Sequence, residues 1–219
     1  MRGVGVSACL VSAVFCLGAA VAADEKPIAP AGEWVVGFKA EFKDSLGKEW
    51  SVLSGNATVA GGALTLKADE DSEAQIMLKE PKFAGSVKME FDATLTGEKP
   101  CDISPVLNAS DDGFASGYLC QFGGAENKQN RLRKESEVVE STVCAKPLIV
   151  PGKKHHVVAE NDNGNIVLSV DGTAVFKYKD ASPLKGWMHN GVGLYTFGCT
   201  LKIENVIVSK KEVASAEKK

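Results

Sequence analysis

The chain has 219 residues, of which 44% are apolar and 24% charged, and its formal net charge is -3. This composition is typical of a soluble globular protein and excludes a collagen-like, disordered or multi-span membrane chain. With 25 basic against 28 acidic residues, no basic field is available to hold a phosphate backbone, so no nucleic acid is expected as a partner. The 22 glycines against 7% aromatic residues favour an all-β domain with many turns.

The N-terminal segment has the composition of a secretory signal. Arg2 precedes an apolar run at 4–21, and Ala22 and Ala23 supply small residues at the expected cleavage site. A retained anchor helix is the alternative, but the run is rich in Gly, Ala and Ser, and no apolar stretch of about 20 residues follows it. We therefore expect a secreted or periplasmic protein with no membrane attachment after cleavage. The expected segments are a signal peptide at 1–23, a linker at 24–32, one domain at 33–209 and a charged flexible tail at 210–219.

The cysteines remaining after signal removal are Cys101, Cys120, Cys144 and Cys199, an even number in an exported chain. Their spacing contains no Cys-x-x-Cys motif and no Cys/His cluster, so zinc is not expected. Structural disulfides or buried thiols are favoured over redox chemistry, and all three possible pairings remain open.

Beyond the linker, apolar and polar residues alternate nearly everywhere, which is the period of a β-strand. The alternation is clearest at 85–96, where Val87, Met89 and Phe91 would face one way and the charged residues between them the other. The predicted strands, in chain order, lie at 50–53, 57–60, 63–67, 74–78, 85–96, 103–108, 116–122, 155–160, 166–170, 174–178, 192–197 and 200–208.

Glycine dipeptides at the turns predict how these strands connect. Gly61-Gly62, Asn163-Gly164 and Asp171-Gly172 can adopt the positive φ values that tight hairpins require. No sustained helical period with caps follows the signal, apart from a turn near 183–187. About twelve meandering strands in one domain predict a two-sheet antiparallel β-sandwich.

Several segments resemble one superfamily. The segments 41–46, 50–52 and 61–66 resemble the entry of secreted bacterial concanavalin A-like sandwiches, with an acidic and aromatic start, a tryptophan strand and a glycine hairpin. The run 154–176 is similar to the laminin G-like hairpin of that superfamily, in which a strand ends in Val-Asp-Gly. The end, 191–206, is similar to its closing strands.

The same order of segments also occurs in the 3-keto-disaccharide hydrolase domain family, formerly a domain of unknown function. The resemblance covers nearly all of 38–209 and implies a concanavalin A-like (jelly-roll) sandwich of the lectin/glucanase superfamily. It also implies a curved face that usually receives a carbohydrate. Activity must be argued from the site, because this fold carries lectins, adhesion modules, hydrolases and lyases.

One candidate site is the polar face of the 85–96 strand. Lys88, Glu90 and Asp92 could bind sugar hydroxyls or share acid and base duties if that face receives a sugar. Otherwise they are solvated charges, the usual arrangement on the outer face of an antiparallel sheet. Compared with the Glu-x-Asp-x-x-Glu strand of retaining glucanases, Leu95 stands where the second carboxylate is needed, so that mechanism is not expected here.

A second candidate site follows the strand at 116–122, which ends in two glycines. Tyr118 and Phe122 could stack on sugar rings, while Gln121 and Arg131 could donate hydrogen bonds to hydroxyls or a carboxylate. The alternative is that the aromatic residues belong to the core and that the polar residues at 127–135 form a solvated loop.

Histidines supply the remaining candidates. His155 and His156 open a strand, so one should point inward and the other outward. Trp187 and His189 could form part of a sugar subsite, with His189 exchanging a proton near neutral pH, or they could form a loop that covers one end of the sandwich.

No cofactor or metal is expected from motifs. A structural calcium site would have to use Asp111, Asp112, Asp162 or Asp171, but no EF-hand spacing is present. The chain contains no Gly-x-Ser-x-Gly nucleophile motif, and no glycine-rich loop opens a helix.

Three functional hypotheses follow. The first is an exported, monomeric carbohydrate-recognition domain that binds a glycan on the concave face of the β-sandwich. The second is an enzyme of the 3-keto-disaccharide hydrolase type, with Glu90, Asp92 or His189 as base and Lys88 or Arg131 as electrophile. The third is an envelope or interaction module that binds no sugar. The candidate ligand-binding residues are Lys88, Glu90, Asp92, Tyr118, Gln121, Phe122, Arg131 and Trp187.

Overall fold

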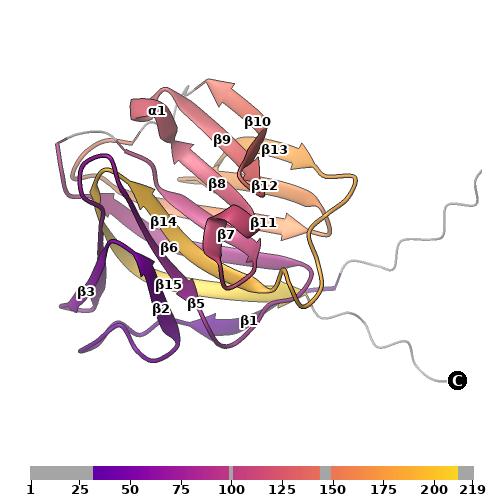
Figure 1. Ribbon diagram of the computed structural model, residues 1–219, viewed down its shortest axis with the longest axis horizontal. Helices are drawn as coiled ribbons and strands as arrows, with labels where there is room; N and C mark the ends of the chain where they lie inside the picture. The colour runs from indigo at the N-terminus through magenta and orange to yellow at the C-terminus, as the bar shows by residue number, and fades with distance from the viewer. Residues whose placement is uncertain (1–31, 99–100, 144–148, 212–219) are drawn as a thin grey trace, which may run out of the picture. The chain divides into compact units, whose positions relative to one another are not determined.

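The computed structural model describes residues 32–98, 101–143 and 149–211, and within these ranges the chain forms two antiparallel sheets packed face to face (Figure 1). The predicted all-β sandwich is therefore confirmed. The expected signal at 1–23, nearly all of the expected linker and Cys144 lie outside the described residues. At the other end, the tail was expected from residue 210, but the last strand continues through Lys211 and pairs Lys210 with Val87.

The first sheet has eight strands. In spatial order they are β13 (Thr173–Lys179), β12 (Asn165–Val170), β11 (Lys154–Asp162), β6 (Val87–Leu95), β15 (Thr200–Lys211), β4 (Ala63–Lys67) and β3 (Asn56–Ala60), with β1 (Trp34–Lys39) also paired to β15. In the central strand of this sheet, β6, buried residues alternate strictly with outward-facing ones.

The second sheet has seven strands and carries the candidate site. In spatial order they are β10 (Glu137–Val143), β9 (Gln129–Lys134), β8 (Tyr118–Gly123), β7 (Ser104–Ala109), β14 (Gly191–Phe197), β5 (Glu73–Leu78) and β2 (Trp50–Ser54). Two short helical turns, η1 (Gly113–Ser116) and α1 (Gly124–Asn127), flank β8.

The main hydrophobic core lies between the two sheets. Met89 and Phe91 of the first sheet are fully buried, as are Ile76 and Leu107 of the second. Burying one such side chain contributes about 1.5–3 kcal/mol, so this core supplies most of the stability of the sandwich.

The three predicted glycine turns are confirmed. Gly62, Gly164 and Gly172 have φ values of 79°, 90° and 76°, and they connect β3 to β4, β11 to β12 and β12 to β13. Because these positive φ values strain any residue with a Cβ, glycine is what lets each strand return beside its predecessor.

Strands β1, β9 and β10 were not predicted, and β9 occupies the segment interpreted as a polar loop. Its alternation is hidden because Leu132 is its one apolar residue, and the other two residues on the same face are the polar Asn130, which is buried, and Lys134. The Asn130 side chain replaces apolar packing with a hydrogen bond, since its Oδ1 accepts the Gly123 N–H at 3.0 Å. A strand of this kind carries no apolar period of two.

Tyr118 anchors the second sheet to the segment that follows β13. Its hydroxyl donates to Asp180 Oδ2 at 2.6 Å and accepts the Leu184 N–H at 2.9 Å. Lys134 Nζ lies 2.8 Å from the same carboxylate, and the Ser182 N–H donates to it at 2.8 Å. Burial raises the pKa of Asp180, but these partners outweigh burial and hold the pKa below its usual value.

One disulfide joins Cys101 to Cys199, closing a loop with a sequence separation of 98. It ties the segment before β7 to the turn between β14 and β15. Cys120 is a buried free thiol whose pKa is raised by burial to about 12, so it is unreactive at neutral pH.

Candidate functional site

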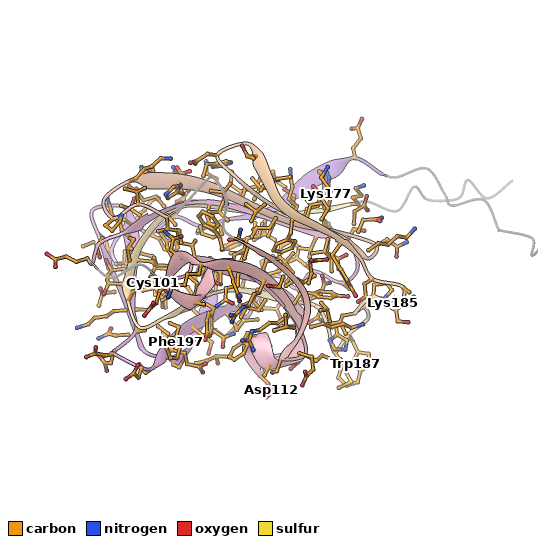
Figure 2. The ribbon with its side chains drawn as sticks, turned by 90° about the horizontal axis from the view of Figure 1, so that it is seen from above. Cys101, Asp112, Lys177, Lys185, Trp187 and Phe197 are labelled. Carbon is orange, nitrogen blue, oxygen red and sulfur yellow. A yellow bond between two sulfur atoms is a disulfide. The ribbon has the colours of Figure 1, made fainter. Side chains whose placement is uncertain are left out.

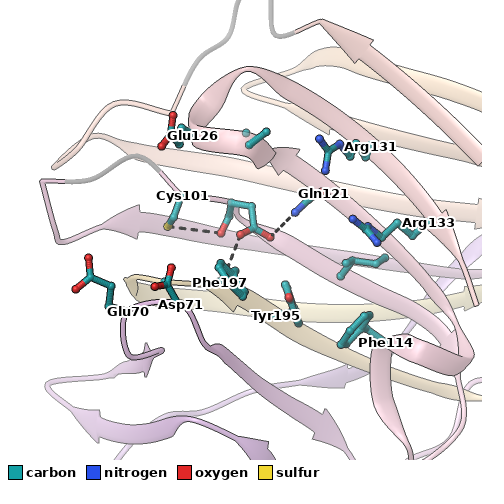
Figure 3. Close-up of a pocket in the computed structure, with 15 residues that line it drawn as sticks. Glu70, Asp71, Cys101, Phe114, Gln121, Glu126, Arg131, Arg133, Tyr195 and Phe197 are labelled. Atoms are coloured by element: carbon teal, nitrogen blue, oxygen red, sulfur yellow. Dashed lines mark hydrogen bonds between the residues drawn. The ribbon is translucent and has the colours of Figure 1, made fainter. Parts of the chain in front are cut away.

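A cavity of about 820 Å³ opens on the outer face of the seven-stranded sheet (Figure 3). Pairing of β8 with β9 places Gln121 beside Arg131 and Leu119 beside Arg133. Since side chains two residues apart share a sheet face, these four project together, away from the core residues between them. β14 contributes Tyr195 in the same way from the other side of β7.

Part of the cavity floor is apolar. Leu119 and Tyr195 belong to a small hydrophobic cluster with Val106 and Met77 that is separate from the main core. Phe114 of η1 packs against this cluster, with its ring centroid 4.8 Å from that of Tyr195. Phe197 also lines the cavity and keeps 45% of its surface exposed, so its ring is available to a ligand.

The other part of the floor is a buried carboxylate, Asp102. It accepts hydrogen bonds from Ser104 Oγ at 2.5 Å, from Gln121 Nε2 at 3.2 Å and from the Phe197 N–H at 3.1 Å. Burial raises the pKa of Asp102, and these donors oppose the effect without cancelling it. Asp102 directly follows Cys101, so the Cys101–Cys199 disulfide links this part of the floor to the turn after β14.

Gln121 has an unusual hydrogen-bond balance. Its residue surface is only 8% exposed and its amide nitrogen is engaged by Asp102, yet its Oε1 is buried with no hydrogen-bond partner. A buried polar atom without a partner costs roughly 1–3 kcal/mol. A ligand that donates a hydrogen bond would remove that cost.

Charges of opposite sign occupy opposite sides of the cavity. Figure 3 shows Arg131 and Arg133 on one side and Glu70 and Asp71 on the other. Glu126 of α1 also lines the rim, where it pairs with Lys128 at 2.7 Å. The arrangement can therefore orient a ligand as well as hold it.

The charged residues of β6 do not reach this cavity. Lys88, Glu90 and Asp92 project outward as predicted, but from the eight-stranded sheet on the other side of the core. Lys88 Nζ lies 3.3 Å from Glu90 Oε2, while Asp92 contacts His156 Nδ1 at 2.9 Å and accepts Asn205 Nδ2 at 2.7 Å.

The pKa of Asp92 reflects those contacts. Partial burial raises it, but the hydrogen bonds from Asn205 and His156 outweigh burial, so the pKa lies below its usual value. These carboxylates are thus engaged with their own neighbours on the outer face of the eight-stranded sheet.

The predicted aromatic platforms lie elsewhere. Tyr118 and Phe122 are fully buried in the main core, so neither ring can meet a ligand on the outer face. Trp187 is 81% exposed, and Figure 2 shows it well apart from Cys101 and Phe197, which line the cavity. His189 is also outside the cavity lining, and its Nδ1 lies 3.1 Å from the Ser116 carbonyl oxygen.

Of the two adjacent histidines, His155 is buried and His156 exposed, as the strand period predicts. His155 Nδ1 lies 3.0 Å from Asp171 Oδ2, and its ring packs edge-on to Phe122. It is therefore part of the core.

Sequence reasoning placed Gln121 and Arg131 in one candidate site but missed Asp102, Tyr195 and Phe197. The strand predicted at 192–197 did contain a signal, because its period of two sets Tyr195 and Phe197 on one face. No comparable signal marks Asp102, since it precedes β7 and acts through contacts made across the sheet.

Three of the four aspartates considered for calcium form ion pairs, and the fourth, Asp112, accepts a hydrogen bond from Ser110 Oγ at 3.2 Å. Asp111 pairs with Lys82, Asp162 with Lys211, and Asp171 with Lys153. Over the three described ranges, no group of three or more His, Cys, Asp or Glu side chains could hold a metal ion. Among the same residues, no helix is both long and apolar enough to cross a membrane.

Comparisons with known proteins identify the fold. No protein-family model and no curated protein matches the chain. A carbohydrate binding module, CBM66 from Bacillus subtilis, is 16% identical over 74% of this chain and 96% of its own, with a TM-score of 0.60. A Bacillus subtilis protein of unknown function with a galectin-like fold is 12% identical over 82% and 100%, with a TM-score of 0.62.

A third similar structure is the endo-beta-1,3-glucanase from Pyrococcus furiosus, which is 13% identical over 85% of this chain and 98% of its own, with a TM-score of 0.59. The chain therefore has the concanavalin A-like, or galectin-like, sandwich fold. At these identities the likeness concerns the fold alone, and the closer resemblance to 3-keto-disaccharide hydrolases stays a prediction.

Proposed function

We propose that this chain is an exported carbohydrate-recognition domain that binds a glycan in the cavity on the seven-stranded sheet. The observation that carries the proposal is the combination, around one opening, of the exposed Phe197 ring with the hydrogen-bonding groups of Gln121 and Arg131. Sugars have an apolar ring face and a rim of hydroxyls, so they suit a site with both kinds of surface.

The size of the cavity and the proteins of similar structure support this proposal. A volume of about 820 Å³ lies within the usual range of small-molecule sites, roughly 300–1,000 Å³. Two of the three proteins compared above are named as a carbohydrate binding module and as a glucanase. The disulfide is in keeping with an exported protein, because such bonds persist in oxidising compartments.

The enzyme hypothesis draws less support from the arrangement. Its candidate bases Glu90, Asp92 and His189 all lie outside the cavity. Glu90 and Asp92 share the outer face of the eight-stranded sheet with the candidate electrophile Lys88, whereas the other candidate electrophile, Arg131, lines the cavity on the seven-stranded sheet. General acid–base catalysis needs these groups within hydrogen-bond reach of one substrate. A recognition function needs no such convergence.

A glycan array followed by titration calorimetry tests the proposal. Phe197→Ala should weaken binding of any glycan hit by about tenfold, which corresponds to the 1.4 kcal/mol expected for losing part of an aromatic contact. Because the ring is exposed, the variant should fold normally. Glu90→Gln should bind as the wild type does. Loss of binding in that variant would mean that the glycan binds on the eight-stranded sheet, and the proposed site would be wrong.

A further inference from the structure

Resting on the proposed glycan function, we infer that the sugar bound in the cavity is an acidic one, a uronic acid whose carboxylate meets Arg131 and Arg133 while a hydroxyl donates to Gln121. The inference follows from three features of the cavity wall: a hydrogen-bond acceptor without a donor, two guanidinium groups that form no ion pair with a carboxylate of the described residues, and their adjacency on two paired strands.

The orientation of the Gln121 amide determines which ligand groups can form hydrogen bonds with the cavity floor. Asp102 already receives the Ser104 hydroxyl and the Phe197 N–H, so it acts as an acceptor and draws the amide N–H of Gln121 toward itself. The amide oxygen is thereby left buried and without a partner beside the cavity. It requires a donor, and a sugar hydroxyl supplies one.

The two arginines carry the charge preference. Arg131 donates to Gln129 Oε1 through Nε at 2.8 Å and also through Nη2, and Arg133 Nη1 donates to the Ser136 carbonyl at 3.2 Å. Within the described residues neither guanidinium forms an ion pair with a carboxylate. Each has five N–H donors, so donors remain for a ligand on both side chains.

The acidic residues of the cavity do not cancel this preference. Glu126 is neutralised by Lys128 on the exposed rim, and Asp102 is occupied in the floor by its three donors. Glu70 and Asp71 stand on the side opposite the arginines (Figure 3). The ligand therefore meets positive charge at the end nearest Gln121.

A uronic acid satisfies both requirements with one residue, because it carries hydroxyls and a carboxylate on the same ring. The planar guanidinium fork matches a planar carboxylate in two parallel hydrogen bonds, a geometry that a lysine ammonium cannot reproduce. Two oxygens of a sulfate ester can also accept a pair of hydrogen bonds from one guanidinium, so a direct comparison of binding is needed to distinguish the two anions.

The test compares oligogalacturonate and oligoglucuronate with their carboxyl-reduced, neutral counterparts and with sulfated galactan oligosaccharides, by titration calorimetry on the mature chain. We expect at least one uronate to bind about tenfold or more tightly than its reduced form, with affinity falling as salt rises. Arg131→Gln and Arg133→Gln should each remove most of that preference, and Arg131→Lys should restore little of it.

Two further variants sharpen the outcome. Gln121→Met should weaken acidic and reduced forms alike, because it removes the acceptor for a hydroxyl and leaves the arginines intact. Lys177→Gln removes one positive charge on a side of the molecule away from Phe197 and Cys101 (Figure 2), so it should leave the preference unchanged.

Each contrary result has a distinct meaning. Equal binding of neutral and acidic forms, or stronger binding of the sulfated ligand, would overturn the uronate inference while the glycan function stands. Failure of every glycan, neutral and acidic, on a folded protein would overturn both.

Discussion

Replacing Tyr118 with phenylalanine tests whether this residue serves the core or a ligand. The ring stays in place, but the buried carboxylate of Asp180 loses a donor at 2.6 Å and the Leu184 N–H loses its acceptor at 2.9 Å. A hydrogen bond to a charged group contributes about 1.5–3 kcal/mol, so the free energy of unfolding should fall by roughly 2 kcal/mol. For a domain of this size that is a decrease in Tm of about 4–8 °C.

Thermal and urea unfolding, followed by circular dichroism, measure the change. Tyr195→Phe is the matched control, because the Tyr195 hydroxyl has no hydrogen bond to any described residue, and it should alter stability by no more than about 0.5 kcal/mol. Glycan binding by the folded Tyr118→Phe protein should equal that of the wild type. Unchanged stability, or a loss of binding without a loss of stability, would refute the core assignment.

Three other perturbations have defined outcomes. The double variant Cys101→Ala, Cys199→Ala removes a disulfide that closes a loop with a sequence separation of 98. Its free energy of unfolding, measured by denaturant titration, should be about 2–5 kcal/mol lower than that of the wild type. If reducing the disulfide of the wild-type protein leaves its free energy of unfolding unchanged, the prediction is wrong. Asp180→Asn should be less stable than the wild type at pH 7. Because the folded pKa of Asp180 is lowered, its contribution is present above its unfolded pKa near 4 and is lost as the pH falls through the folded pKa, so the two Tm values should converge as the pH is lowered below about 4. In an assay of 3-keto-glucoside turnover, Glu90→Gln and Asp92→Asn should have the same activity as the wild type. If either variant abolishes turnover, the protein is an enzyme whose active site lies on the eight-stranded sheet.

The strand pattern predicted the class of fold because it depends on local rules. Alternation along β6 and positive φ at Gly164 and Gly172 are decided within a few residues, so they can be read before any tertiary contact is known. The same rules missed β9, where Asn130 is buried by a hydrogen bond instead of by apolar packing.

The candidate site was predicted only in part. Gln121 and Arg131 were singled out for their side-chain chemistry, and the pairing of β8 with β9 does bring them together. Tyr118 and Phe122 were grouped with them by sequence proximity, yet the period of two turns those rings into the core.

What the sequence by itself determined is the set of strands, the tight turns and the alternation that gives each strand one buried face, because these follow from the local geometry of the chain. Which strands became neighbours, and so which outward face acquired a cavity, was decided by tertiary structure. Asp102, Phe197 and Arg131 come from three separate segments and meet through sheet pairing, which no local pattern encodes. The same pairing left Glu90 and Asp92 on the opposite sheet, among their own partners.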